Sequence, residues 1–233
     1  MNPVILISSL LVVSYLIGSI PWGIIISKKF FGFDIRTKGS GNIGSTNVFR
    51  TLGTKWGIIV QILDILKGVI PVLIAGWLGR GITFPNATGF EDITIIKFSA
   101  GVMAILGHIF TVFAGFKGGK GINTALGVFI AISPVDLGIA MGVFLISLIM
   151  SGYVSLGSIM AGLTVPVSLF LRYNVFNVNI PGYHFLIYAT IFIALLVIYT
   201  HRSNIKRLLK RQENHFAKLQ LIKIKFLMPK NKS

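Results

Sequence analysis

Apolar runs of about 18 to 22 residues recur along the chain, and each is long enough to cross a hydrocarbon core of about 30 Å as a helix. Of the 233 residues, 54% are hydrophobic and 12% are charged, with a mean hydropathy of +0.82. A soluble domain carries about twice that share of charge. The sequence therefore predicts an all-α, polytopic membrane protein. The first run, from Val4, lacks the basic start of a signal peptide, so we expect a retained helix.

The apolar runs predict about seven transmembrane helices. The long apolar stretch 122–150 is divided in two, because Ser133-Pro134 followed by Asp136 is typical of a turn or a helix start. The expected spans are approximately 4–26, 56–79, 94–115, 122–133, 135–150, 154–171 and 184–200.

The distribution of Lys and Arg predicts the orientation of these helices. With the N-terminus outside, about eighteen of the 22 basic residues fall on the cytoplasmic side, which predicts an N-out, C-in topology. Residues 1–203 are expected to form the transmembrane domain and residues 204–233 a basic cytoplasmic tail, whose far end lies on the membrane surface. We therefore attribute the net charge of +16 to residues that set the membrane orientation and attract anionic lipids or substrates, and not to nucleic-acid binding. The absence of cysteine excludes disulfides and thiol chemistry.

Two predicted cytoplasmic loops are suited to an anion. The first, KGSGNIGSTNVFR at 38–50, has glycines that permit positive φ and close backbone approach, so that successive N–H groups can point at one anion. The second, KGGKG at 117–121, places two ammonium groups before an apolar helix, where phosphate binds readily. It is not a Walker A loop, because Gly121 follows Lys120 where Ser or Thr is required.

A third polar cluster, HRSNIKRLLKRQE, begins at the cytoplasmic end of the last span. His201 and Asn204 share a helical face, which Lys206, Arg207 and Glu213 extend. A His at this place can bind phosphate or transfer a proton. Each cluster also has a simpler explanation as a flexible turn, as topology-determining lysines or as an interfacial anchor. Their joint occurrence on one face favours an anion site.

Further polar residues lie at or within the spans. Asp64 and Lys67 can pair on one helical face as a structural ion pair, or Lys67 can contact a substrate. Ser155 and Ser158 serve in capping and packing or in substrate contact. We expect a buried, hydrogen-bonded His108 and not a metal ligand, because no acidic residue stands at ligand spacing from it. The sequence predicts no metal site and no cofactor.

The combined clusters suit a reaction between phosphate-bearing reactants, at least one of which carries a fatty chain. The sequence has no thiol, no GxSxG motif and no paired carboxylates at these loops. Catalysis would then come from positioning and from charge neutralisation.

Six motifs closely resemble the bacterial integral-membrane acyl-phosphate:glycerol-3-phosphate acyltransferases. They are GSIPWG, SGNIGSTNVFRTLG, DILKG, GHIFTVFAGFKGGKGINTALG, YVSLGS and HRSNIKRLLKRQE. The resemblance implies a seven-helix enzyme of the bacterial cytoplasmic membrane with its active site on the cytoplasmic face. Such an enzyme transfers the acyl group of a fatty acyl phosphate to the 1-hydroxyl of sn-glycerol 3-phosphate. The products are lysophosphatidic acid and phosphate, in the first acylation step of phospholipid synthesis, with membrane lipids as the remaining partners.

The resemblance also implies the site residues. The catalytic set is Ser40, Arg50, Lys120, His201 and Asn204. The set that binds substrate phosphate is Asn42, Thr46, Asn47, Lys117, Gly118, Gly119 and Ser155. The hydroxyl proton passes either to His201 or to a substrate phosphate, and we favour the phosphate, with Lys and Arg stabilising the developing oxyanion.

Three residues depart from the family pattern. Thr111 stands where Pro is usual, and Asn123 and Ser45 stand where Ala is usual. These changes bear on loop geometry or on substrate affinity. The basic tail is an addition to the pattern.

Three other functions are open to such a chain. A lipid-phosphate transporter would distribute polar residues through the midplane and often contain a repeat, whereas here they crowd one face. A membrane scaffold accounts for the tail but not for the glycine loops. An acyltransferase with a His-x₄-Asp dyad is disfavoured, because Phe113 and Lys206 stand at that spacing from the two candidate histidines. Acyl phosphate as the donor follows from the resemblance alone.

Overall fold

The computed structural model describes residues 2–84, 90–216 and 220–221, and the regular structure within these residues is entirely helical. The prediction of an all-α fold is confirmed. The chain divides into two compact units, residues 1–133 and 134–233, which are described separately. The predicted domain boundary after residue 203 falls inside α10 (Arg202–Leu209), which belongs to the second unit.

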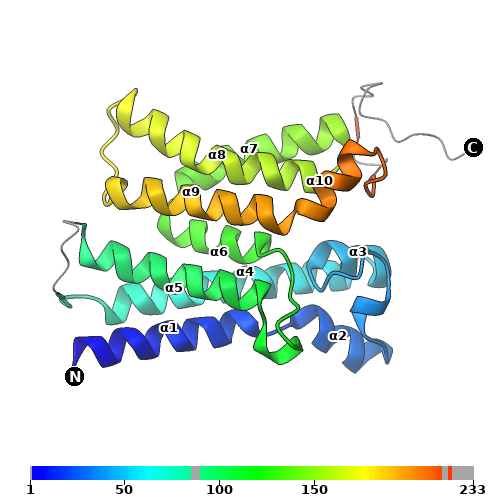
Figure 1. The fold of residues 1–233 in the computed structure, drawn as a ribbon, viewed down its shortest axis with the longest axis horizontal. Helices are drawn as coiled ribbons and strands as arrows, with labels where there is room; N and C mark the ends of the chain where they lie inside the picture. The colour runs from blue at the N-terminus through cyan, green and yellow to red at the C-terminus, as the bar shows by residue number, and fades with distance from the viewer. Residues whose placement is uncertain (1, 85–89, 217–219, 222–233) are drawn as a thin grey trace, which may run out of the picture. The chain divides into compact units, whose positions relative to one another are not determined.

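The first unit contains three long helices that run side by side (Figure 1). These are α1 (Pro3–Ser19), α4 (Thr54–Leu78) and α5 (Asp92–Ile109). The shorter elements are α2 (Trp22–Phe31), η1 (Ile35–Thr37), α3 (Ser45–Leu52), η2 (Val112–Ala114) and α6 (Ile122–Ile132). The polar loop expected after the first span therefore contains a helix, α3.

The second unit contains α7 (Pro134–Ser151), α8 (Val154–Asn174), α9 (Tyr183–Thr200) and α10. The predicted break at Ser133-Pro134 is confirmed, since α6 ends at Ile132 and α7 begins at Pro134.

Among the described residues, six helical segments are long and apolar enough to span a membrane. They are Pro3–Phe31, Thr54–Leu78, Asp92–Ala114, Pro134–Ser151, Val154–Asn174 and Tyr183–Thr200. The remaining predicted span is α6, which has 11 residues and rises about 16 Å, roughly half of the hydrocarbon thickness. The count of seven and the orientation therefore stay predictions.

The first span is not the single helix that the apolar run predicts. It breaks between α1 and α2 at Ile20-Pro21, because Pro lacks the N–H that would continue the helical ladder. The carbonyl oxygens at the break accept bonds from other segments of the unit. Thr111 Oγ1 donates to Ser19 O, and Lys67 Nζ donates to Ile20 O at 2.9 Å. The break thus anchors two distant parts of the chain.

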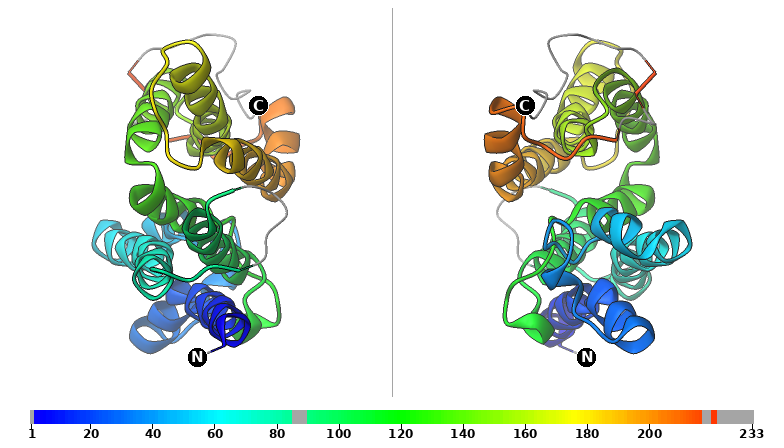
Figure 2. Two further views of the ribbon diagram at one scale, coloured as in Figure 1. Left: turned by 90° about the vertical axis from the view of Figure 1, so that its left-hand side faces the viewer. Right: turned by 90° about the vertical axis from the view of Figure 1, so that its right-hand side faces the viewer.

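Glycines set the helix contacts of the first unit. A Cβ on Gly18 of α1 would lie 2.1 Å from Ala104 O, and one on Gly107 of α5 would lie 2.2 Å from an α1 carbonyl. Gly68 of α4 and Gly127 of α6 meet each other's helices in the same way, at 2.1 Å. Small residues at such crossings let helix backbones approach closely in a membrane. Figure 2 shows the close packing of α1 with α5 from both ends.

The second unit buries a paired carboxylate between α7 and α8. Asp136 accepts hydrogen bonds from Ser168 Oγ and Arg172 Nη1, both at 2.5 Å. A buried carboxylate requires such partners, because its desolvation is costly otherwise. The pair therefore fixes the register of the two helices.

The start of the tail folds back onto the turn between α7 and α8. Phe216 N donates to Gly152 O at 2.9 Å, and Leu221 N donates to Ile149 O at 3.0 Å. The ring of His215 packs on Tyr153 with centroids 5.2 Å apart. Residues 222–233, for which a membrane-surface segment is predicted, lie outside the described residues.

Candidate active site

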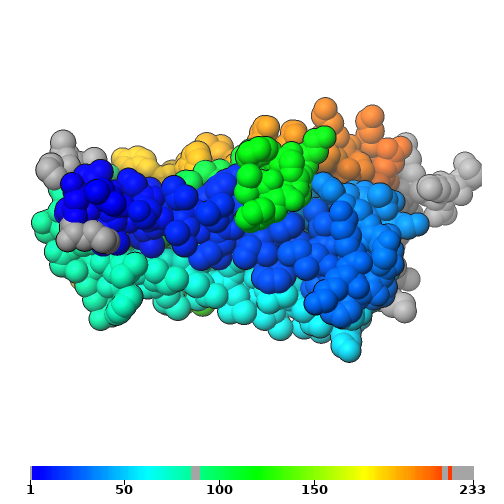
Figure 3. All heavy atoms as spheres, turned by 90° about the horizontal axis from the view of Figure 1, so that it is seen from below, coloured from blue at the N-terminus to red at the C-terminus, as the bar shows by residue number. Residues whose placement is uncertain are grey.

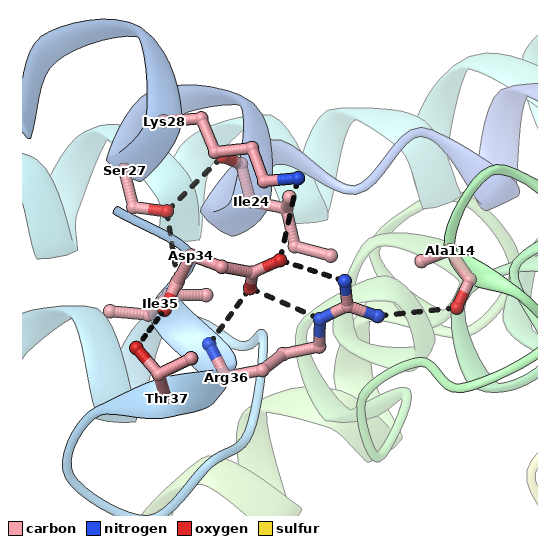
Figure 4. A network of polar contacts seen from close by, with 8 residues as sticks. All are labelled: Ile24, Ser27, Lys28, Asp34, Ile35, Arg36, Thr37 and Ala114. Carbon is pink, nitrogen blue, oxygen red and sulfur yellow. Dashed lines mark hydrogen bonds and ion pairs between the residues drawn. The ribbon is translucent and has the colours of Figure 1, made fainter. Parts of the chain in front are cut away.

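A carboxylate in the turn just before the first loop organises the arginine beside it (Figure 4). Asp34 Oδ1 accepts from Arg36 N and Nε at 3.0 Å, and Oδ2 accepts from Nη2 at 2.7 Å. The guanidinium holds the pKa of the Asp34 carboxyl well below its usual range. Arg36 Nη1 also donates to Ala114 O at 3.3 Å, so the first loop is tied to the segment that follows α5.

Asn47 shapes the first loop from within. Its Oδ1 accepts from Ser40 N at 2.8 Å, and its Nδ2 lies 2.9, 3.1 and 3.3 Å from the carbonyl oxygens of Asn42, Lys38 and Ile35. The residue is 1% exposed, and both ends of its amide face the loop backbone. Asn47 is a predicted phosphate ligand, but in the structure its hydrogen bonds hold the loop's curve.

The glycines of the first loop have different conformations. Gly39 and Gly41 have positive φ, of 58° and 72°, as the sequence suggests. Gly44 has φ −76° and caps α3, where its N–H donates to Asn42 Oδ1 at 2.9 Å. The other predicted residues of this loop are accessible to different degrees: Ser40 and Arg50 are exposed and Thr46 is half-buried.

The second loop is bound to the end of α5 through its backbone. Gly118 N donates to Ile109 O, and Gly119 N donates to His108 O, both at 3.0 Å. These carbonyls belong to the last turn of α5, where no helical partner exists. The two glycine N–H groups therefore bond to the protein itself. The flanking Lys117 is exposed and Lys120 is half-buried.

Side chains from the two loops meet at the starts of α3 and α6. Asn123 Nδ2 donates to Ser45 Oγ at 2.8 Å, across 78 positions of sequence. Together with the Arg36 contact to Ala114, this bond places the two glycine loops next to each other. The sequence singles out both residues as departures from the family pattern but does not predict their contact. The contact could have been inferred from the sequence, because a hydrogen-bond donor and an acceptor both stand at positions where the family pattern has Ala.

The ion pair predicted in α4 is present and buried. Lys67 Nζ lies 2.8 Å from Asp64 Oδ1, and both side chains are 3% exposed. His108 is also buried, as predicted, but the expected hydrogen bond is absent at Nδ1, which lies 3.7 Å from the same carboxylate oxygen and has no hydrogen-bond partner among the described residues. The predicted pairing is confirmed, while the choice between a structural role and a substrate contact for Lys67 stays a prediction. The pair adjoins the end of α5 that carries the second loop.

The predicted histidine and asparagine of the second unit share a buried face. His201 is 2% exposed, and its Nδ1 lies 2.9 Å from Val197 O. Because a carbonyl only accepts, Nδ1 carries the proton of the neutral imidazole, and Nε2 is then the nitrogen that can accept one. Asn204 Nδ2 donates to Glu213 Oε1 at 2.8 Å, and Arg207 Nε donates to Glu213 Oε2 at 2.7 Å.

The two serines at the start of α8 differ. Ser158 Oγ donates to Val154 O at 2.9 Å, an ordinary bond within the helix. Ser155 Oγ and Asn204 Oδ1 are buried and, among the described residues, have no hydrogen-bond partner. Buried polar atoms are seldom left without a partner, so these two can still accept a bond from a ligand. No capping bond from Ser155 is present at the described start of α8.

The long apolar helices and the cationic glycine loops are those of an integral membrane acyltransferase, as comparison with solved structures shows. The chain is similar to PlsY (YgiH), an integral membrane glycerol 3-phosphate acyltransferase, in its glycerol 3-phosphate form. The TM-score is 0.77 at 39% identity, covering 91% of this chain and 96% of that one. The lysophosphatidic acid form gives 0.75 at 38% identity, with 92% and 97% covered.

Sequence comparisons agree with the structural one. The model of the glycerol-3-phosphate acyltransferase family matches residues 8–211. The glycerol-3-phosphate acyltransferase of Chlorobaculum tepidum is 43% identical over 227 residues, covering 90% of this chain and 96% of the relative. That of Chlorobium limicola is 41% identical over 224 residues, with 88% and 94% covered. The chain belongs to the glycerol-3-phosphate acyltransferase family, and the tail bound to the α7–α8 turn lies beyond the matched residues.

Proposed function

We propose that this protein transfers the acyl group of a fatty acyl phosphate to the 1-hydroxyl of sn-glycerol 3-phosphate, giving lysophosphatidic acid and phosphate. The family membership and the two ligand forms of the solved relative support the acceptor and the product. The motif resemblance supports acyl phosphate as the donor. The observation that carries the proposal is the Asn123–Ser45 bond, because it brings two cationic glycine loops together in one unit.

The reaction needs only positioning and charge compensation. The 1-hydroxyl oxygen attacks the acyl carbonyl carbon, the bond between that carbon and the phosphate oxygen breaks, and phosphate leaves with the electron pair. The hydroxyl proton passes to a substrate phosphate, our preferred route, or to His201. Fixed cations near the carbonyl oxygen and the leaving phosphate stabilise the charge that develops.

The predicted site residues of the first unit divide into those that contact the substrate and those that shape the loops. Exposed and half-buried side chains on the loops would contact the phosphates, whereas Asn47, Gly118 and Gly119 shape the backbone that carries these side chains. The proposed contacting residues are Ser40, Asn42, Thr46, Arg50, Lys117 and Lys120. From the second unit we propose contacts by Ser155, His201 and Asn204. Ser155 Oγ and Asn204 Oδ1 lack a hydrogen-bond partner within the described part of the chain, and His201 Nε2 can accept a proton, which supports that role.

Turnover with two donors tests the reaction. Purified protein in lipid is given glycerol 3-phosphate with palmitoyl phosphate or palmitoyl-CoA, and released phosphate and lysophosphatidic acid are followed. We expect turnover with the phosphate donor only. Lys120→Ala should abolish it, and Lys97→Ala, a lysine of α5 outside the loops, should not. Folded protein that turns over neither donor would overturn the proposal and bring the transporter forward.

The role of His201 is tested separately. His201→Ala with full turnover would remove this residue as the base and leave the substrate phosphate. His201→Gln keeps a hydrogen-bonding side chain but cannot take a proton at neutral pH. A large loss in the alanine variant with recovery in the glutamine variant would assign His201 a binding role.

We also propose that the chain crosses the bacterial cytoplasmic membrane seven times, N-out and C-in, with the loops in the cytoplasm. The excess of Lys and Arg on one face supports this orientation. Since the chain has no cysteine, single cysteines report sidedness cleanly. Arg80→Cys should react with an impermeant maleimide in intact cells, and Lys29→Cys and Arg211→Cys only after permeabilisation. Labelling of Lys29→Cys and Arg211→Cys on opposite sides would overturn the orientation.

A further inference from the structure

We propose that His108 is a positioning residue that sets the position of the phosphate-binding loop 117–121, from its place between that loop and the buried Asp64–Lys67 pair. The inference rests on the proposed function for the identity of the ligand. It adds a support that lies inside the helices and does not touch the substrate.

His108 meets the loop with both its backbone and its side chain. The loop bonds to the backbone of this residue through Gly119 N, 3.0 Å from His108 O. The side chain packs on the same glycine, because a Cβ on Gly119 would lie 2.1 Å from His108 Nε2. Real Cβ atoms do not approach other atoms so closely, so the imidazole and the loop backbone limit each other's position. Lys117 and Lys120 flank this contact.

The other side of the imidazole faces the ion pair of α4. His108 Nδ1 lies 3.7 Å from Asp64 Oδ1, too far for a hydrogen bond, and it has no such partner among the described residues. The same carboxylate oxygen binds Lys67 Nζ at 2.8 Å. Lys67 in turn donates to Ile20 O at the break of the first span, at 2.9 Å. Hydrogen bonds therefore connect the break to Asp64 of α4, and the imidazole beneath the loop lies next to that carboxylate without bonding to it.

Neighbouring bonds hold the rest of this segment on α1. Tyr15 Oη donates to Phe110 O at 2.6 Å, and Thr111 Oγ1 donates to Ser19 O. Figure 3 shows the segment after α5, in green, lying over the blue surface of the first span. With its start fixed by these bonds and its glycines seated on His108, the loop has little freedom to move its two lysines.

Charged groups within a membrane helix are costly and need a compensating role. A purely structural ion pair would explain Asp64 and Lys67 but not the contact of His108 with Gly119. The two glycines offer a way to separate these cases. A Cβ on Gly119 meets the removable His108 ring, whereas a Cβ on Gly118 meets the His108 and Ile109 carbonyl oxygens, at 2.0 and 2.6 Å.

The test is therefore a compensation experiment with a matched control. Gly119→Ala should push the loop from its seat, and His108→Ala in the same protein should make room for the added methyl group. Gly118→Ala should not be rescued by His108→Ala, because the carbonyl oxygens remain. Each variant is measured for the KM of glycerol 3-phosphate, for kcat, and for the rate of tryptic cleavage after Lys117 and Lys120.

We expect Gly119→Ala to raise the KM about tenfold or more and to accelerate cleavage, with most of both effects reversed in the double variant. His108→Ala alone should raise the KM more than it lowers kcat, and His108→Gln, which keeps much of the ring's volume, should restore it. Equal failure of the two double variants would overturn the inference. So would a His108→Ala variant that loses thermal stability but keeps the wild-type KM and cleavage rate.

The cleavage rate separates this inference from the proposed function. If wild-type protein turned over no donor, the proposed function would fall. Selective rescue of Gly119→Ala in the tryptic digest would still support His108 as the seat of the loop, and no difference in cleavage among the variants would refute it.

Discussion

The two glycine loops of the first unit reach stable shapes by different physical means. In the first loop, Gly39 and Gly41 adopt positive φ, and the curve is held by one buried amide side chain, that of Asn47. In the second loop, Gly118 and Gly119 lack positive φ and instead lie against the end of α5. Gly41 of the first loop therefore needs to be glycine for its conformation, whereas Gly118 and Gly119 of the second need to be glycine for space. Gly39 combines both reasons, and Gly121, at the end of the second loop, again has positive φ, of 80°.

This difference shows why a glycine-rich sequence is weak evidence for a particular anion-binding mode. Neither loop simply presents free glycine N–H groups to a ligand, because the N–H groups of Gly41, Gly118 and Gly119 donate to backbone carbonyl oxygens of the protein. The phosphate-binding capacity of the site depends more on the side chains that these rigid loops carry. Four predictions test this difference between the two loops, in order of decreasing expected effect.

Replacement of Asn47 should do the most damage to the first loop. Asn47→Ala leaves the Ser40 N–H and several carbonyl oxygens without their partner, at a cost of about 2 to 4 kcal/mol. We expect loss of most activity and a lower midpoint of thermal unfolding. Asn42→Ala, which removes one bond to Gly44 N, is the comparison and should unfold closer to the wild type. Equal midpoints for the two variants would contradict a central role for Asn47.

Substitution by asparagine should distinguish conformation from space. Asn tolerates positive φ better than Ala, so Gly41→Asn should be less damaging than Gly41→Ala, which we expect to cost about 1 to 2 kcal/mol. At Gly118 the order should reverse, because the larger side chain collides more severely with the carbonyl oxygens behind it. Thermal unfolding and KM for glycerol 3-phosphate check both orders. If Asn were less damaging than Ala at both positions, or more damaging at both, the distinction between glycines needed for conformation and glycines needed for space would be wrong.

The bond between the loops should contribute a measurable coupling. Ser45→Ala and Asn123→Ala each remove the 2.8 Å bond, and each is expected to cost about 1 kcal/mol. In a double-mutant cycle the second substitution should add little to the first. The KM for glycerol 3-phosphate should rise in each single variant. Fully additive effects on stability would show that the two side chains act independently.

Acidification should loosen the start of the first loop by a small amount. The pKa of Asp34 is lowered in the folded protein, so its ionised form contributes stability above the ordinary carboxyl pKa of 3.8. That contribution is lost progressively as the pH falls below this value. The effect is modest because the ion pair with Arg36 is partly exposed. The midpoint of thermal unfolding should therefore fall slightly more below pH 3.8 in the wild type than in Asp34→Asn, which has no carboxylate to protonate at this position. Equal falls in the two proteins would contradict a contribution from Asp34.

Several features could be predicted because they depend on neighbouring residues. The helical membrane fold follows from apolar runs, the Ser133-Pro134 break from turn chemistry, and the Asp64–Lys67 pair from a spacing of three on one helix. The burial of His108 also follows from its apolar surroundings. The break at Ile20-Pro21 was missed because hydropathy alone does not register a missing N–H within an otherwise continuous apolar run.

The sequence by itself determined the class of fold, the family and the segments that carry the candidate site, since hydropathy, charge and motifs are read locally along the chain. Only the tertiary structure decided that Asn123 meets Ser45, that Asn47 turns inward, and that Gly119 rests on His108. Such contacts arise when packed helices bring distant segments within bonding distance. A position can require glycine because of its backbone φ or because a neighbouring atom leaves no room for a Cβ. Which of the two applies depends on that packing, which the order of residues does not show.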